Sequence, residues 1–195
     1  WVWLAQANYW EGLLLQDDGR PEGDQLAAYE RGVDAARKAA AADPRHPGGP
    51  FWDGVNSAKV AELRGIARSV TLLPHLRSCV DRTDALQPGY FFGGTARFRG
   101  AVITRTPSVL VTLQGGSEEE GRRHLAQAEK EGPTFVGTRR FQAELALKRG
   151  RKEQAVAILK AAMQVADGPD PEEAAWNRHE RRIIRRMLDE HAPGK

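Results

Sequence analysis

One spacing of small and large residues recurs four times along this chain of 195 residues, and it constrains the fold more than any other feature. Each copy has four positions: a small residue (a leucine in the second copy), a larger residue, a second small residue, and a proline or aspartate. These positions follow one another at intervals of four, three and five residues. Gaps of three and four place side chains on one helix face, and proline ends a helix. Each copy therefore predicts a closely packed helix. The copies are Gly32, Ala36, Ala39 and Pro44; Leu76, Val80, Thr83 and Pro88; Gly121, Leu125, Ala128 and Pro133; and Ala155, Leu159, Ala162 and Asp167.

This pattern is that of the second helix of a tetratricopeptide repeat, a helical hairpin that stacks on its neighbours. The last residues of the copies lie 44, 45 and 34 residues apart. A standard repeat has 34 residues, so the first two intervals carry about ten extra residues each, which lengthen helices or loops. The alternative is an alanine-rich helical bundle in which the spacing arises by chance.

Glycine and proline clusters predict the ends of about nine helices joined by short connections. Ser117 and Asp170 are expected N-caps, each followed by acidic residues. No segment alternates as a strand would, so we expect an all-α, tetratricopeptide-like helical-hairpin solenoid forming a single domain over residues 1–195. The predicted repeats span residues 1–44, 51–88, 90–133 and 135–167, and a C-terminal capping helix spans residues 171–191.

Composition excludes several classes of protein. The net charge of +3 is too small to indicate nucleic acid as a partner, and no apolar run is long enough to span a membrane. A single cysteine, Cys79, excludes an internal disulfide or a multi-cysteine zinc site. Because the chain begins at Trp1 rather than methionine, we expect its natural start to lie upstream.

No catalytic motif is present, so we expect no enzymatic activity, no cofactor and no metal. His75 and Cys79 lie four residues apart on one face of a predicted helix. This pair could bind a metal or couple a thiolate to a base, but a metal site needs further ligands. We favour a buried thiol beside a partly exposed histidine. The enzyme alternative requires an exposed and reactive Cys79.

Aromatic residues gather in the predicted first helices of the hairpins, which line the concave face of a solenoid. We expect an apolar groove there, flanked by cations that suit an acidic peptide or a carboxylate. The alternatives are that the rings pack within the repeats and that the arginines are merely solvated. The candidate groove residues are Trp52, Asn56, Lys59, Phe92, Arg97, Phe98 and Arg139, with Arg140 beside them.

The last predicted helix carries an apolar stripe opposite five arginines between Trp176 and Leu188. We favour a capping helix that covers the last hairpin and turns its charged face to water. Binding to anionic lipid or RNA is the alternative.

Three segments resemble the periplasmic T-component proteins that accompany TRAP transporters. FWDGVN at residues 51–56 is similar to that family's YW-x-G-V-N segment, and YFFGGTARFRG at residues 90–100 to its YF-x-GGPHR-x-L-G segment. GGSEE at residues 115–119 resembles its GGD-x-E helix start. Arg97 matches the family's arginine, whereas Thr95 and Ala96 stand where Pro and His are usual. Eukaryotic regulators of microtubule dynamics share the lengthened-repeat layout.

The resemblance implies a periplasmic or cell-envelope location, no catalysis, and binding of a protein partner or of a hydrophobic, lipid-like small molecule. We therefore expect a non-catalytic adaptor or accessory subunit that uses the aromatic groove. The alternative is a structural scaffold subunit of a larger cell-envelope assembly.

Overall fold

The computed structural model of the chain describes residues 1–113 and 115–192, with residues 66–70 described by their backbone alone. These residues form ten helices, and no strand occurs among them, so the predicted all-α class is confirmed. The sequence predicted about nine helices, and the additional helix is a short one of six residues. The chain divides into two compact units between Tyr90 and Phe91, which is close to the start of the third predicted repeat at residue 90.

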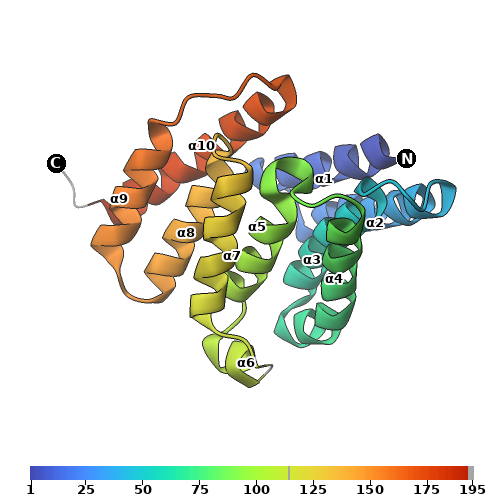
Figure 1. The fold of residues 1–195 in the computed structure, drawn as a ribbon, viewed down its shortest axis with the longest axis horizontal. Coiled ribbons are helices and arrows are strands. Elements are labelled where there is room, and N and C mark those ends of the chain that lie inside the picture. The colour runs from blue at the N-terminus through green and yellow to red at the C-terminus, as the bar shows by residue number, and fades with distance from the viewer. Residues whose placement is uncertain (114, 193–195) are drawn as a thin grey trace. The chain divides into compact units, whose positions relative to one another are not determined.

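The first unit consists of two successive helical hairpins (Figure 1). They are formed by α1 (Val2–Asp17) with α2 (Glu22–Ala42) and by α3 (Gly48–Arg64) with α4 (Ile66–Leu86). Each helix packs against the next one along the chain, and α1 also contacts α3. The unit therefore has the layered arrangement that stacked helical hairpins produce.

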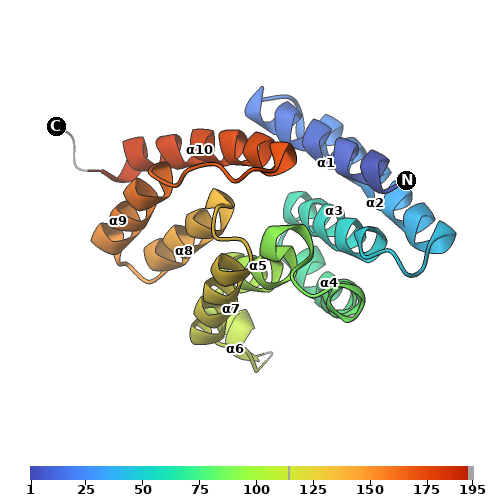
Figure 2. The ribbon, with the colours of Figure 1, turned by 45° about the horizontal axis from the view of Figure 1, so that its top comes forward.

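The second unit contains a third and a fourth hairpin and a final long helix (Figure 2). The last hairpin is α8 (Val136–Lys148) with α9 (Lys152–Met163), and α10 (Pro171–His191) packs against both of these helices. The predicted capping role of α10 agrees with this packing. The earlier helices are α5 (Tyr90–Arg105), the short α6 (Ser108–Leu113) and α7 (Glu118–Glu131).

The recurring sequence pattern contributes buried residues to both units. The first three positions of all four copies are buried. At Gly32 a Cβ atom would overlap the side chain of Asn56, and at Gly121 it would lie 2.8 Å from Ile103 Cγ2. Small residues therefore let α2 approach α3, and α7 approach α5. This close approach is the reason for the small residue in the pattern.

The two predicted N-caps are also confirmed. Ser117 Oγ accepts a hydrogen bond from the backbone N–H of Glu120 at 3.1 Å. Asp170 Oδ1 accepts from the backbone N–H groups of Glu172 and Glu173, and Pro171 occupies the first helical position. These bonds satisfy donors that a helix start leaves without partners within the helix.

Among the residues described, no helix combines the length and the apolar character needed to cross a membrane.

Candidate functional site

The seven predicted groove residues divide between the two units. Trp52, Asn56 and Lys59 lie on α3 of the first unit and are all buried. In the second unit Arg97 is buried, whereas Phe92, Phe98 and Arg139 are partly exposed. The groove itself stays a prediction, and the contacts of each side chain show what it does within its own unit.

Trp52 and Asn56 hold helices of the first unit together. The Trp52 side chain is 1% exposed, and its ring lies 5.7 Å from Tyr9 and 5.2 Å from Phe51 between centroids. Asn56 Nδ2 donates to the carbonyl oxygens of Trp52 at 2.9 Å and of Ala5 at 3.3 Å. The second bond joins α3 to α1. Both residues therefore pack within the first unit, and a role of either in partner binding stays a prediction.

The Lys59 ammonium already has partners within the first unit. Its Nζ donates to Glu62 Oε2 at 3.0 Å and to Gln16 Oε1 at 3.3 Å. It also lies 5.6 Å from the centroid of the Tyr29 ring. The charge is thus balanced by a carboxylate and supported by an aromatic face.

Arg97 stabilises an unusual turn at the start of α5. Phe91, Phe92 and Gly93 have φ values of 58°, 56° and 75°, so three successive residues adopt the left-handed conformation. For a residue with a side chain this conformation costs roughly 1–2 kcal/mol. The Arg97 guanidinium donates to the carbonyl oxygens of Phe92 at 2.8 Å and of Phe91 at 3.1 Å. It also stacks 3.9 Å above the Phe135 ring, so the arginine of the family-like segment has a structural role here.

The other candidate cations of the second unit are also paired. Arg139 forms an ion pair with Glu129 at 2.8 Å. The buried Arg140 contacts both Glu144 and Glu180. Although burial lowers the pKa of Arg140, the two carboxylates raise it well above its usual value. A carboxylate from outside would therefore have to displace an internal one.

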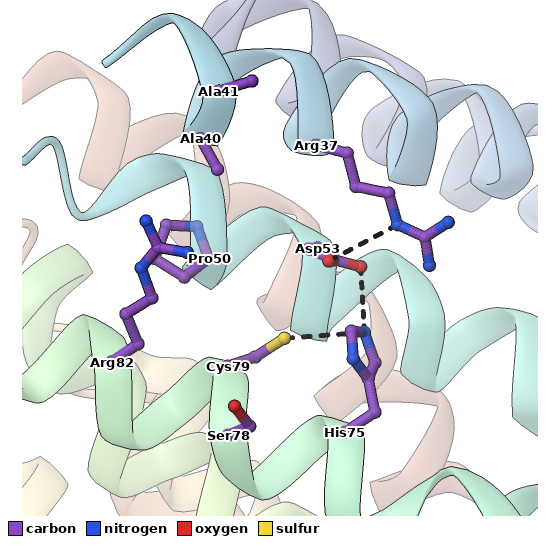
Figure 3. A pocket seen from close by; sticks show the side chains of 9 residues that line it. All are labelled: Arg37, Ala40, Ala41, Pro50, Asp53, His75, Ser78, Cys79 and Arg82. Carbon is purple, nitrogen blue, oxygen red and sulfur yellow. Dashed lines mark hydrogen bonds and ion pairs between the residues drawn. The ribbon is translucent and has the colours of Figure 1, made fainter. Parts of the chain in front are cut away.

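A pocket of about 360 Å³ opens in the first unit where α2, α3 and α4 meet (Figure 3). Arg37 from α2, Asp53 from α3, and His75 and Cys79 from α4 converge on it. The pair predicted to share a helix face does so, and the structure adds a carboxylate from another helix. The rest of the lining consists of Ala40, Ala41, Pro50, Ser78 and Arg82.

The acidic, imidazole and thiol groups of this pocket meet at a single ring nitrogen. His75 Nε2 lies 3.1 Å from Asp53 Oδ1 and 3.6 Å from Cys79 Sγ. In a catalytic triad the acid and the nucleophile contact opposite nitrogens of the imidazole, because the ring passes a proton between them. The observed arrangement therefore differs from that of a triad.

The thiol is also poorly suited to nucleophilic attack. Cys79 is 6% exposed, and burial, reinforced by the negative charge of Asp53, raises the pKa of its thiol to about 12. The reactive form of cysteine is the thiolate, which such a pKa suppresses at neutral pH. The enzyme alternative required an exposed and reactive Cys79, and this geometry does not support it. The three donor atoms are, however, of types that bind transition metals.

The carboxylate is fixed in place by two neighbours. Ser57 Oγ donates to Asp53 Oδ1 at 3.0 Å, and Arg37 Nε lies 3.6 Å from Asp53 Oδ2. The sequence did not indicate Asp53 as a partner of His75, because the two residues are 22 positions apart on different helices. The sequence carries only a weak indication of this carboxylate. Asp53 and Ser57 are four residues apart on α3, the helix that precedes α4 in the hairpin, so they share one face of that helix.

A second pocket, of about 230 Å³, lies among α7, α8 and α9 of the second unit. We call it the arginine-rimmed pocket, because Arg122, Arg149 and Arg151 line it and are all exposed. Two of them also form ion pairs, Arg122 with Glu119 and Arg149 with Glu118. Apolar side chains form most of the remaining wall, with two glutamines. This part of the lining comprises Leu125, Ala126, Gln142, Leu145, Ala146, Gln154 and Ile158.

A comparison with a solved structure places the fold beside that of a known protein. The crystal structure of TTC0263, a thermophilic TPR protein in Thermus thermophilus, matches with a TM-score of 0.54 and 18% sequence identity. The match covers 90% of this chain and 98% of that chain. No protein-family model matches the sequence, and no curated protein does so either.

The likeness establishes the fold and nothing finer. The chain is an all-α protein built from helical hairpins of the tetratricopeptide type, as its repeat pattern predicted. At this identity the match says nothing of a partner, and the resemblance to T components of TRAP transporters stays a prediction.

Proposed function

We propose that this chain is a non-catalytic protein-interaction module and that the arginine-rimmed pocket of the second unit receives an acidic segment of its partner. The single observation that carries this proposal is the convergence of three exposed arginines on an apolar hollow, where an incoming carboxylate would share Arg122 with Glu119 and Arg149 with Glu118. Guanidinium groups bind carboxylates through charge-assisted hydrogen bonds, and the apolar wall can take a hydrophobic side chain beside them. Folds of stacked helical hairpins commonly present such surfaces to other proteins.

The size of the pocket favours a peptide side chain over a free small molecule. Ligand pockets usually enclose about 300–1,000 Å³ and bury most of their ligand. At about 230 Å³ the arginine-rimmed pocket is smaller than that range. An anchor of one leucine or phenylalanine with neighbouring carboxylates fits this volume better than a lipid-like tail.

The finer role that we propose is that of an adaptor or accessory subunit of a cell-envelope transport system, resembling the T components of TRAP transporters. The similarity of residues 51–56 and 90–100 to segments of that family supports this role and a periplasmic or envelope-associated location. The alternative, a structural scaffold subunit in a larger envelope assembly, is supported by the same fold.

The test uses a fluorescent peptide of alternating glutamate and leucine and measures its binding by anisotropy. We expect saturable binding to the native chain and about tenfold weaker binding to the double variant Arg149→Gln/Arg151→Gln, which corresponds to about 1.4 kcal/mol. The matched control is Lys152→Gln/Lys160→Gln, which removes the same charge from exposed positions of α9 outside the pocket lining.

Two results would contradict the proposal. One is equal weakening in both double variants, which would show that the peptide responds to net charge alone. The other is unsaturable binding to the native chain. If the peptide binds as expected, a photo-crosslinking amino acid at Gln154, which lines the pocket, identifies the natural partner. The same amino acid placed at Lys160, outside the pocket lining, is the control.

A further inference from the structure

The side chains of Asp53, His75 and Cys79 form a three-donor cluster in the pocket of the first unit. One carboxylate oxygen, one ring nitrogen and one sulfur all lie within 4.8 Å of one another. The cluster joins α3 to α4, since Asp53 comes from the former and the other two from the latter (Figure 3).

Two of the three donor separations agree with the edges of a tetrahedral metal site, and the third, between the Asp53 oxygen and the Cys79 sulfur, is within 4.8 Å. Zinc–nitrogen bonds of about 2.0–2.1 Å and zinc–sulfur bonds of about 2.3 Å place nitrogen and sulfur about 3.6 Å apart across a tetrahedral angle. A zinc–oxygen bond of about 2.0 Å places oxygen and nitrogen about 3.3 Å apart. The corresponding distances in the structure are 3.6 Å and 3.1 Å.

We propose that Asp53 Oδ1, His75 Nε2 and Cys79 Sγ bind one divalent transition-metal ion of the zinc class, with its fourth coordination position open to the pocket.

Hydrogen bonding alone accounts less well for this convergence. One imidazole N–H can point directly at only one acceptor, yet Nε2 lies near both the carboxylate and the sulfur. A cation placed among the three donors interacts with all of them at once. On binding, the Cys79 thiol releases its proton to solvent and the sulfur becomes a thiolate ligand.

The donor types determine the class of metal. Imidazole and thiolate select zinc and neighbouring transition metals, whereas magnesium and calcium require oxygen ligands. The Asp53 carboxylate and the Cys79 thiolate together balance the two positive charges of the ion. The guanidinium groups of Arg37 and Arg82 oppose a cation, but both residues are exposed and solvent weakens their effect.

The surroundings of the carboxylate suit a ligand. Metal-bound carboxylates are usually held by further hydrogen bonds, which orient them toward the ion. Ser57 donates to Asp53 Oδ1, and Arg37 lies against Oδ2, so the side chain is already positioned. The pocket of about 360 Å³ leaves room for a water or an external ligand at the fourth position.

The test uses the full chain, stripped of metal with a chelator and titrated with Co²⁺ alone. Tetrahedral cobalt bound to a thiolate absorbs strongly in the visible range and shows a sulfur-to-cobalt charge-transfer band in the near ultraviolet. We expect both signals to saturate at one equivalent and to disappear when Zn²⁺ displaces the cobalt. Zn²⁺ is also expected to raise the melting temperature, because it binds the folded state.

Three variants probe the ligands: Cys79→Ser, His75→Gln and Asp53→Asn. Changing a residue that merely supports a ligand weakens metal binding by about 10–100-fold, so loss of a ligand is expected to weaken it at least about 100-fold. Cys79→Ser should also abolish the charge-transfer band. The matched controls, His46→Gln and Asp34→Asn, change exposed residues of the same unit and should bind as the native chain does.

Circular dichroism of the metal-free variants reports whether each one folds, and if Asp53→Asn does not, the other two variants carry the test. The proposal is overturned if the native chain gives no charge-transfer band, or if folded Cys79→Ser and His75→Gln bind the metal as tightly as the native chain. Peptide binding in the presence of chelator tests the proposed function separately, because the arginine-rimmed pocket lies in the other unit.

Discussion

At the scale of single residues, the cations predicted to flank a groove are mostly occupied by partners in their own unit. Arg97 binds two backbone carbonyls, Arg139 binds Glu129, and Lys59 binds Glu62. A sequence shows that a cation is present but not whether an internal acceptor lies within its reach. The arginines that line a pocket, such as Arg151, carried no special signal in the sequence.

Replacing Arg97 with alanine should destabilise the second unit by about 2 kcal/mol, because two hydrogen bonds from a charged group are lost at a strained turn. Urea denaturation followed by circular dichroism measures the change. Arg123→Ala, at an exposed position of α7, is the control and should stay within about 0.5 kcal/mol of the native chain. Equal stability of Arg97→Ala and the native chain would contradict this role.

The Cys79 thiol should react very slowly with a disulfide reagent in the folded, metal-free chain. Its sulfur is buried, and a pKa of about 12, compared with 9.0 for an unperturbed thiol, lowers the thiolate fraction at pH 8 by roughly 1,000-fold. Because the pKa is raised, reactivity should increase as the pH rises toward 12. Absorbance of the released thiol gives the rate, and the urea-unfolded chain provides the fast reference. Rapid reaction of the folded chain would refute the burial of this residue.

Asp53 illustrates what sequence analysis could not supply for the candidate site. The spacing of His75 and Cys79 within one helix is visible in the sequence, and the structure confirms that they share a face. The third group comes from a different helix, and its approach depends on how α3 and α4 pack. Periodicity within a helix carries no information about that packing.

At the scale of helices, small residues decide how closely the elements approach. The recurring pattern was sufficient to predict which helices pack through small residues. The same pattern could not predict the left-handed turn, since Phe91 and Phe92 have no preference for positive φ and hold it only through their tertiary contacts. Similarly, α6 is too short to show a helical period.

Two glycines of α2 should respond in opposite ways to replacement by alanine. At Gly32 a Cβ would overlap Asn56, so Gly32→Ala should destabilise the chain by about 1–3 kcal/mol through overpacking. At Gly23 nothing lies within 4 Å, so Gly23→Ala should stabilise it by about 0.5–1 kcal/mol through helix propensity. Melting curves of the two variants against the native chain test the pair. A stabilising Gly32→Ala would show that the two helices are not held this closely.

The buried ion pair between Arg140 and Glu180 fixes α10 on α8. Glu180→Gln should cost about 3 kcal/mol, because removing one partner of a buried pair leaves the other charge poorly compensated, although Glu144 still contacts Arg140. The midpoint of urea unfolding reports this loss. Glu190→Gln, at an exposed position of the same helix, should leave the midpoint unchanged. If both variants lowered the midpoint equally, net charge rather than the buried pair would be responsible.

At the scale of the whole molecule, the chain consists of two compact units with separate cores and different charge. Tyr29, Val33 and Val60 form one core, and a larger cluster around Leu159 and Ile184 forms the other. The basic excess of the chain lies in residues 91–195, whereas residues 1–90 are weakly acidic. The single domain expected from the length of the chain stays a prediction, and length alone does not indicate how a series of hairpins divides into compact units.

Because each unit has its own core, residues 1–90 and 91–195 should each fold when produced separately. We expect helical circular dichroism and cooperative urea unfolding from both fragments, with lower stability than in the intact chain because smaller domains bury less surface. The first fragment should retain cobalt binding through Asp53, His75 and Cys79, and the second should retain peptide binding at Arg149 and Arg151. A fragment that is largely unfolded in the absence of urea would show that its core depends on the rest of the chain.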